Sequence, residues 1–152
     1  MNILKQMPVW IYISLFGLIS YIKSTTVMEI GIINQQDTTA SGLIYEIIET
    51  GSGPIAKVGD VVLIHETTQL VDGTMITDTW ALNHPIRFLL GGNQVIKGMD
   101  EAVTGMQVGE RRKLIVPPSL SKRSSYPENG LYGPSDTLYY NVILLQVSEY
   151  KK

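Results

Sequence analysis

Turn residues divide the chain from residue 42 to residue 147 into short segments, and this division constrains the fold most. The breaks include Gly51-Ser52-Gly53-Pro54, Asp72-Gly73 and Gly91-Gly92. Between them, apolar residues alternate with polar ones or form short runs, as in strands. The segments with strand character cover residues 43–48, 61–70, 74–78, 86–90, 112–116 and 137–147. Such segments favour an antiparallel sheet, because tight turns join antiparallel neighbours.

One segment has helical spacing instead. Val95, Met99, Val103 and Met106 are separated by four, four and three residues, so they share one face of a helix, with Ile96 beside them. Residues 119–136 form a long irregular loop by their composition. The economical architecture is an α+β fold, in which an antiparallel sheet of five or six strands wraps around one short α-helix.

Charge and composition exclude several classes of function. A net charge of −2 and a pI near 5.6 give no electrostatic basis for binding nucleic acid. We interpret the cluster Arg111-Arg112-Lys113 as a solvated strand edge, and the nearby acids Asp100, Glu101 and Glu110 as surface charges. Without cysteine, the chain has no disulfide, thiol nucleophile or cysteine-ligated metal. We interpret His65 as a strand residue and His84 as the residue before a proline. We therefore expect no metal and no cofactor.

The N-terminus carries an uncharged apolar run from Pro8 to Ile22, between Lys5 and Lys23. A run of about 15 residues suits a signal peptide better than a membrane span, which needs roughly 20. We therefore predict that residues 1–24 are a signal peptide, and that the protein is exported to the periplasm or cell envelope. The alternative is an uncleaved anchor in contact with the membrane through residues 8–22. Residues 25–40 read as a linker, with a polar stretch from Gln35.

The order of these segments, and specific residues in them, match a known family. The matching stretches are SGLIYEIIETGSG, VGDVVLIHETTQLVDGTMI, FLLGGNQVIKGMDEAVTGMQVGERRKLIVPP and TLYYNVILLQV. They resemble the FKBP-type peptidyl-prolyl cis-trans isomerases, over a domain that we place at residues 41–150. The resemblance implies a bent antiparallel sheet curved around one short helix, and it implies proline-containing polypeptides as substrates. No residue pattern addresses the oligomeric state.

The chemistry of such an isomerase explains the absence of a catalytic triad. Rotation about a peptide bond faces a barrier of about 18–20 kcal/mol because resonance gives the bond double-bond character. No covalent bond has to break, so a catalyst needs only to bind the twisted amide more tightly than the planar one. An apolar cup for the proline ring and one donor for the preceding carbonyl are sufficient. In the family, the backbone N–H at the position of Ile96 is that donor.

The resemblance also implies the side chains of the cup. Val95 and Ile96 are retained, and Phe88 matches a family aromatic. Met99 occupies the floor position, which is a tryptophan in the best-known members. Three positions that are phenylalanine in the family carry other residues here, namely Ile76, Ile86 and Tyr140.

The polar residues of the family site are largely replaced. Glu66 occupies a tyrosine position, and Thr77 occupies the aspartate position, with Asp78 one residue later. The arginine that pairs with the aspartate falls on Leu82, and the tyrosine leading into the long loop falls on Lys122, whose role Tyr126 or Tyr132 could take over. These replacements leave two hypotheses open. The protein is an isomerase with reduced activity, or it is a catalytically weak or inactive binding or chaperone module.

Overall fold

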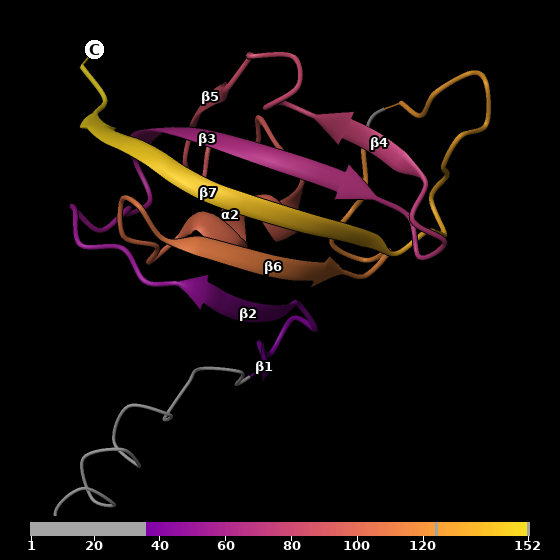
Figure 1. Ribbon diagram of the computed structural model, residues 1–152, viewed down its shortest axis with the longest axis horizontal. Helices are drawn as coiled ribbons and strands as arrows, with labels where there is room; N and C mark the ends of the chain where they lie inside the picture. The colour runs from indigo at the N-terminus through magenta and orange to yellow at the C-terminus, as the bar shows by residue number, and fades with distance from the viewer. Residues whose placement is uncertain (1–35, 124, 152) are drawn as a thin grey trace, which may run out of the picture. The chain divides into compact units, whose positions relative to one another are not determined.

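The computed structural model describes residues 36–123 and 125–151, and these form one antiparallel sheet of seven strands with one α-helix (Figure 1). The predictions for residues 1–24, and for the linker up to residue 35, lie outside the described residues. The elements are β1 (Gln36–Thr38), β2 (Ile44–Glu49), β3 (Asp60–Gln69), β4 (Met75–Asp78), β5 (Ile86–Leu89), α2 (Lys97–Val103), β6 (Arg111–Val116) and β7 (Leu138–Glu149).

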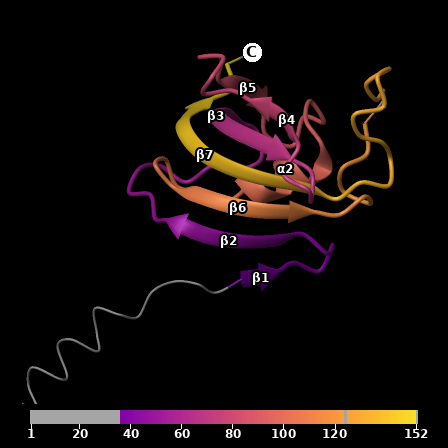
Figure 2. The same cartoon turned by 45° about the vertical axis from the view of Figure 1, so that its right-hand side comes forward.

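The strand order is β1-β2-β6-β7-β3-β4, and β5 pairs with the first half of β3. All pairs are antiparallel. β7 lies between β6 and β3, which explains its nearly continuous apolar sequence, because a central strand is buried along most of its length. Figures 1 and 2 show the sheet curving around α2, which lies behind β6 and β7 in the view of Figure 1.

The core lies between the curved sheet and α2. The helix contributes Met99, Ala102 and Val103, and Met106 is buried just beyond its last turn. These side chains pack in one cluster with alternate residues of β3, β6 and β7. A Cβ added at Gly98 would come within 2.5 Å of Val116 Cγ1, so this glycine is what lets α2 approach β6.

The α+β fold predicted from the sequence is confirmed, including the six expected strands and the single short helix of the described region. One additional strand is present. β1, within the polar stretch interpreted as a linker, pairs with Ile44 to Glu46 of β2. Its three residues are exposed, so neither apolar alternation nor length marked them as a strand. Within residues 36–123 and 125–151, no helix is long and apolar enough to cross a membrane.

The interpretation of Arg112 and Glu110 as solvated surface charges is wrong. Arg112 is 9% exposed and Glu110 is 5% exposed, and the Arg112 Nε donates to Glu110 Oε1. Arg112 Nη1 also donates to the carbonyl of Ala102 at 2.9 Å, and its guanidinium lies 4.8 Å from the centre of the Tyr45 ring. The pleat of β6 turns Arg112 toward the helix, and this set of partners satisfies its charge there.

Candidate functional site

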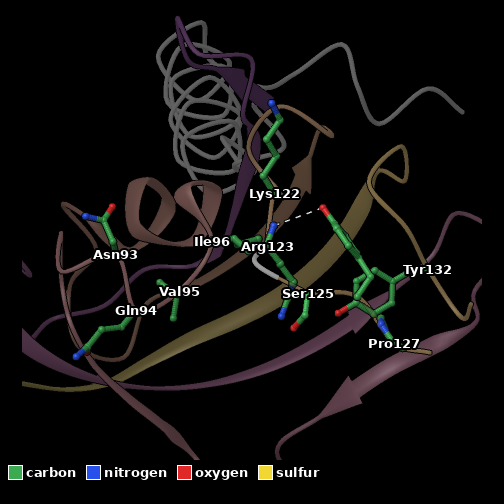
Figure 3. A pocket seen from close by; sticks show the side chains of 10 residues that line it. Asn93, Gln94, Val95, Ile96, Lys122, Arg123, Ser125, Pro127 and Tyr132 are labelled. Atoms are coloured by element: carbon green, nitrogen blue, oxygen red, sulfur yellow. Dashed lines mark hydrogen bonds between the residues drawn. The ribbon is translucent and has the colours of Figure 1, made fainter. Parts of the chain in front are cut away.

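A cavity of about 570 Å³ opens between the segment that precedes α2 and the long loop that joins β6 to β7 (Figure 3). One side is formed by residues 93–96, and the other by residues of the 122–132 region. The lining residues are Asn93, Gln94, Val95, Ile96, Lys122, Arg123, Ser125, Tyr126, Pro127 and Tyr132. The cavity therefore joins two parts of the chain that are about 30 residues apart in sequence.

A tight turn positions the first side. Gly91 and Asn93 have positive φ values of 78° and 55°, a conformation that glycine and asparagine adopt more readily than other residues. The chain then extends through Ile96, whose φ of −64° and ψ of 152° place it directly before the helix.

The backbone of Ile96 has an open donor. Its carbonyl accepts bonds from the N–H groups of Met99 and Asp100, at 3.0 and 3.1 Å. Its own N–H donates to no acceptor among the residues that the structure describes. A polar group at a cavity wall without a protein partner can bond a ligand carbonyl.

The second side is built from two tyrosines and an arginine. Tyr126 and Tyr132 meet edge to face with ring centres 6.0 Å apart. The Arg123 N–H donates to the Tyr126 hydroxyl at 3.4 Å, shown as a dashed line in Figure 3, and the Arg123 guanidinium lies 5.7 Å from the centre of the Tyr132 ring. The loop thus presents aromatic surface and a positive charge to the cavity.

A buried polar group extends from this loop into the sheet. Arg123 Nη2 donates to the hydroxyl of Tyr140 on β7 at 3.3 Å. Glu66, on β3, is 7% exposed and faces the core side with Ile64 and Thr68. The Thr68 hydroxyl donates to Glu66 Oε1 at 3.3 Å.

Burial perturbs the titration of both Glu66 and Tyr140. Loss of hydration raises the pKa of the Glu66 carboxyl, against smaller opposing effects of the Thr68 hydrogen bond and of the Arg123 charge. Burial, and then the negative charge of Glu66, raise the pKa of Tyr140 to about 12, so this phenol stays protonated. The wall between β3 and β7 therefore carries two polar groups whose ionised forms are disfavoured by burial.

Four residues predicted for the site line the cavity, namely Val95, Ile96, Tyr126 and Tyr132. The others do not line it. Met99, Phe88 and Tyr140 are enclosed in the core, at 2%, 3% and 4% exposure, while Ile76 and Ile86 are half-buried and pack against that core. Their contact with a ligand stays a prediction. The structure places the open amide and the loop aromatics at the cavity surface.

Asp78 has a clear structural role. Its Oδ1 accepts bonds from the N–H groups of Trp80 and Ala81, both at 3.0 Å, and so closes the turn after β4. It does not line the cavity.

Arg123 is a cavity residue that sequence reasoning did not identify. It lies in an irregular loop, and no local pattern separates it from other surface arginines. Only the path of the loop brings it to Tyr140 and Tyr132, so no signal in the sequence itself could have found it. The same holds for Asn93, Gln94, Ser125 and Pro127.

Residues 53–145 match the family model described as FKBP-type peptidyl-prolyl cis-trans isomerase. The curved sheet around one helix defines this class of protein, and the chain belongs to this family.

Several known proteins are similar to this chain. The 46 kDa FK506-binding nuclear protein of Spodoptera frugiperda is 34% identical over 110 residues, which are 71% of this chain and 26% of that protein. FkpA, an FKBP-type peptidyl-prolyl cis-trans isomerase of Escherichia coli, is 33% identical over 112 residues, 72% of this chain and 39% of FkpA. The match thus spans between about a quarter and two fifths of these two relatives.

A shorter relative is matched almost completely. The FK506-binding protein of Neisseria meningitidis is 36% identical over 108 residues, 71% of this chain and 98% of that protein. Among solved structures, the crystal structure of FkpA from Escherichia coli superimposes with a TM-score of 0.68 at 26% identity, covering 95% of this chain and 75% of that one.

Proposed function

We propose that this protein is a peptidyl-prolyl cis-trans isomerase that acts on proline-containing polypeptides. The observation that carries the proposal is the open N–H of Ile96 in a cavity whose lining includes the apolar and aromatic side chains of Val95, Tyr126 and Tyr132 beside polar ones. The proline ring packs on Val95, Ile96 and the loop tyrosines, and the N–H of Ile96 bonds the carbonyl that precedes the proline. Membership of the isomerase family supports the assignment.

Catalysis then follows from binding rather than from covalent chemistry. A twisted amide has lost its resonance, so its carbonyl is less polarised and tolerates an apolar surrounding better than the planar amide does. A fixed amide donor that aligns with the carbonyl in the twisted geometry stabilises that state further. Uncatalysed isomerisation takes roughly 10–100 s, so a modest stabilisation of the twisted state is already a measurable acceleration.

A single substitution tests the donor. Ile96→Pro removes the N–H, while proline's fixed φ of about −65° matches the φ of −64° at this position. Ile96→Val keeps the N–H and shortens the side chain, so it is the matched control. We expect Ile96→Pro to lower kcat/KM on a short Xaa-Pro peptide by about tenfold, as for one lost hydrogen bond, and Ile96→Val to change it much less.

Three outcomes of the peptide assay are decisive. No acceleration by the folded wild-type protein at micromolar concentration would exclude the isomerase. Equal rates for wild type and Ile96→Pro, both folded by circular dichroism, would exclude the amide as the donor. Acceleration that falls only in Ile96→Pro supports both parts of the proposal.

A second function is favoured by Glu66. A carboxyl group on the core side of β3, with its pKa raised by burial, makes the β3–β7 wall less apolar than a proline cup requires. In this alternative the protein binds prolyl segments without accelerating their isomerisation. Binding of an Xaa-Pro peptide by NMR titration, with no line broadening from cis-trans exchange, would favour it. That the protein acts after export stays a prediction, which N-terminal sequencing of the mature protein tests.

A further inference from the structure

The charges at the cavity have one sign. Lys122 and Arg123 are the charged residues that line it, and every other lining residue is neutral. In Figure 3, Arg123 lies between the 93–96 segment and Tyr132, and Lys122 lies at the edge of the cavity. A ligand that fills the space from Ile96 to Tyr132 therefore passes beside the Arg123 guanidinium.

Neither cation is neutralised by an ion pair. The salt bridges among the described residues are Arg111 with Glu49 and Arg112 with Glu110, so neither Lys122 nor Arg123 has a described carboxylate within 4.0 Å. The contacts of the Arg123 guanidinium are neutral, namely the Tyr140 hydroxyl and the Tyr132 ring. Both cationic side chains are exposed and can turn toward a ligand.

One acid lies within electrostatic reach of Arg123. Glu66 is buried on the core side of β3, where it accepts a hydrogen bond from Thr68, and no salt bridge joins it to Arg123. The charges that line the cavity are therefore positive, and neither is paired with a carboxylate among the described residues.

We propose that the cavity selects prolyl peptides in which the residue before proline is acidic, with Arg123 as the main specificity-determining residue and Lys122 as a second one. This rests on the proposed function, in which the carbonyl of that residue bonds the N–H of Ile96. Ile96 and Arg123 line the same cavity, so in this proposal the side chain of the same residue extends toward Arg123. The carboxylate of an aspartate or glutamate before the proline then bonds the Arg123 guanidinium in place of water.

The expected size of the effect is modest. Ion pairs at exposed sites stabilise by about 0.2–1 kcal/mol, which corresponds to a preference of about 1.4- to fivefold. Such a preference falls as salt increases, because screening shortens the reach of exposed charges. A preference due to shape alone would not depend on salt.

The test uses the full chain and blocked peptides Ala-Xaa-Pro-Phe, with Xaa as Glu, Gln or Lys. NMR exchange spectroscopy gives kcat/KM without a coupled protease, and the chemical shifts give Kd for the same peptides. For the wild type at pH 7 and low salt we expect Glu above Gln above Lys, with Glu about 1.4- to fivefold above Gln. We expect Arg123→Gln to bring the ratio of Glu to Gln close to one, and Arg123→Glu to place Lys above Glu.

Lys57→Gln is the matched control, because it removes one positive charge from an exposed residue that does not line the cavity. It should keep the wild-type ratio. Acceleration that is equal for the Glu and Gln peptides, or a ratio that Arg123→Gln does not change, overturns this specificity and leaves the isomerase standing. If no peptide is accelerated, the isomerase is overturned instead, and Kd values that are equal for Glu and Gln then overturn the specificity as well.

Discussion

Glu66 places a carboxyl group where the core side of β3 would otherwise be apolar. It lies between Ile64 and Thr68 on the same face of the strand, and its partner in the structure is one hydroxyl at 3.3 Å. Because hydration is lost, the folded protein binds a proton at this carboxyl more tightly than the unfolded chain does. At neutral pH the ionised form therefore opposes folding.

The sign of this effect leads to a prediction for Glu66→Gln. The pKa of Glu66 in the folded protein is raised above its ordinary value of 4.5, so its contribution to stability is most favourable below pH 4.5. That contribution is lost as pH rises from 4.5 through the raised pKa. Glu66→Gln removes the titration. The free energy of unfolding of this variant should therefore fall less than that of wild type over this pH window, and it should exceed the wild-type value at pH 7.

Urea unfolding from pH 4 to pH 8 measures the difference between the two curves. Glu128→Gln, at an exposed loop residue, is the matched control and should keep the wild-type slope. If the stability of Glu66→Gln depended on pH in parallel with that of wild type, burial of the Glu66 carboxyl would not destabilise the protein.

The helix α2 depends on the absence of a side chain at one position. Gly98 is buried, and a Cβ there would lie 2.5 Å from Val116 Cγ1 and 3.4 Å from Leu120 Cβ. Valine has little rotational freedom, so β6 or the helix would have to shift. This close approach positions Ile96, at the helix start, against the loop that carries Arg123.

We therefore expect Gly98→Ala to destabilise the protein, although alanine is the better helix former by about 1 kcal/mol. Overpacking costs about 1–3 kcal/mol, so after the gain in helix propensity the net loss in urea unfolding should be up to about 2 kcal/mol. The double variant Gly98→Ala with Val116→Ala tests whether the clash with Val116 causes this loss. The substitution at 98 should cost less in the Val116→Ala background than in wild type, and an equal cost would mean that Val116 is not the obstacle.

At the scale of the whole molecule, Arg112 joins the parts of the fold. It bonds Glu110 at the start of β6, the carbonyl of Ala102 in α2 and the ring of Tyr45 in β2. Glu110 also accepts the N–H of Gln107 at 2.9 Å, which holds the turn between helix and strand. One buried ion pair thus connects the helix, a central strand and the strand beside it.

Removing Arg112 should therefore unfold the protein more readily than removing its neighbour. Arg112→Ala leaves Glu110 buried without its partner, and we expect a loss of about 3–5 kcal/mol of stability. Arg111→Ala breaks an exposed pair with Glu49 at 3.7 Å and should cost less than about 1 kcal/mol. Thermal or urea unfolding of both variants measures this, and equal losses would contradict a joining role for Arg112.

The residues that local patterns identified correctly are those whose neighbours in sequence decide their environment. The period-two segments became β2 to β7, and Met99 and Val103 point to the core because helical spacing places them on one face of α2. Val95 and Met106, predicted on the same helical face, lie outside α2. Arg112 was assigned wrongly because its partners Ala102 and Tyr45 lie on other elements. Glu110 was assigned wrongly because it is buried with Arg112 as an ion pair. The three exposed residues of β1 carry no apolar pattern, so only pairing with β2 reveals them.

The sequence by itself determined the α+β class, the order of the strands along the chain and the family, because these depend on periodicity, turn residues and matched motifs that are local in the chain. Only the tertiary structure decided what surrounds Ile96. The described residues of the 122–132 loop form no regular element, and the course of the loop depends on contacts such as Arg123 with Tyr140. Long-range packing, not local propensity, places a cation in the same cavity as the open amide, and that placement defines the site.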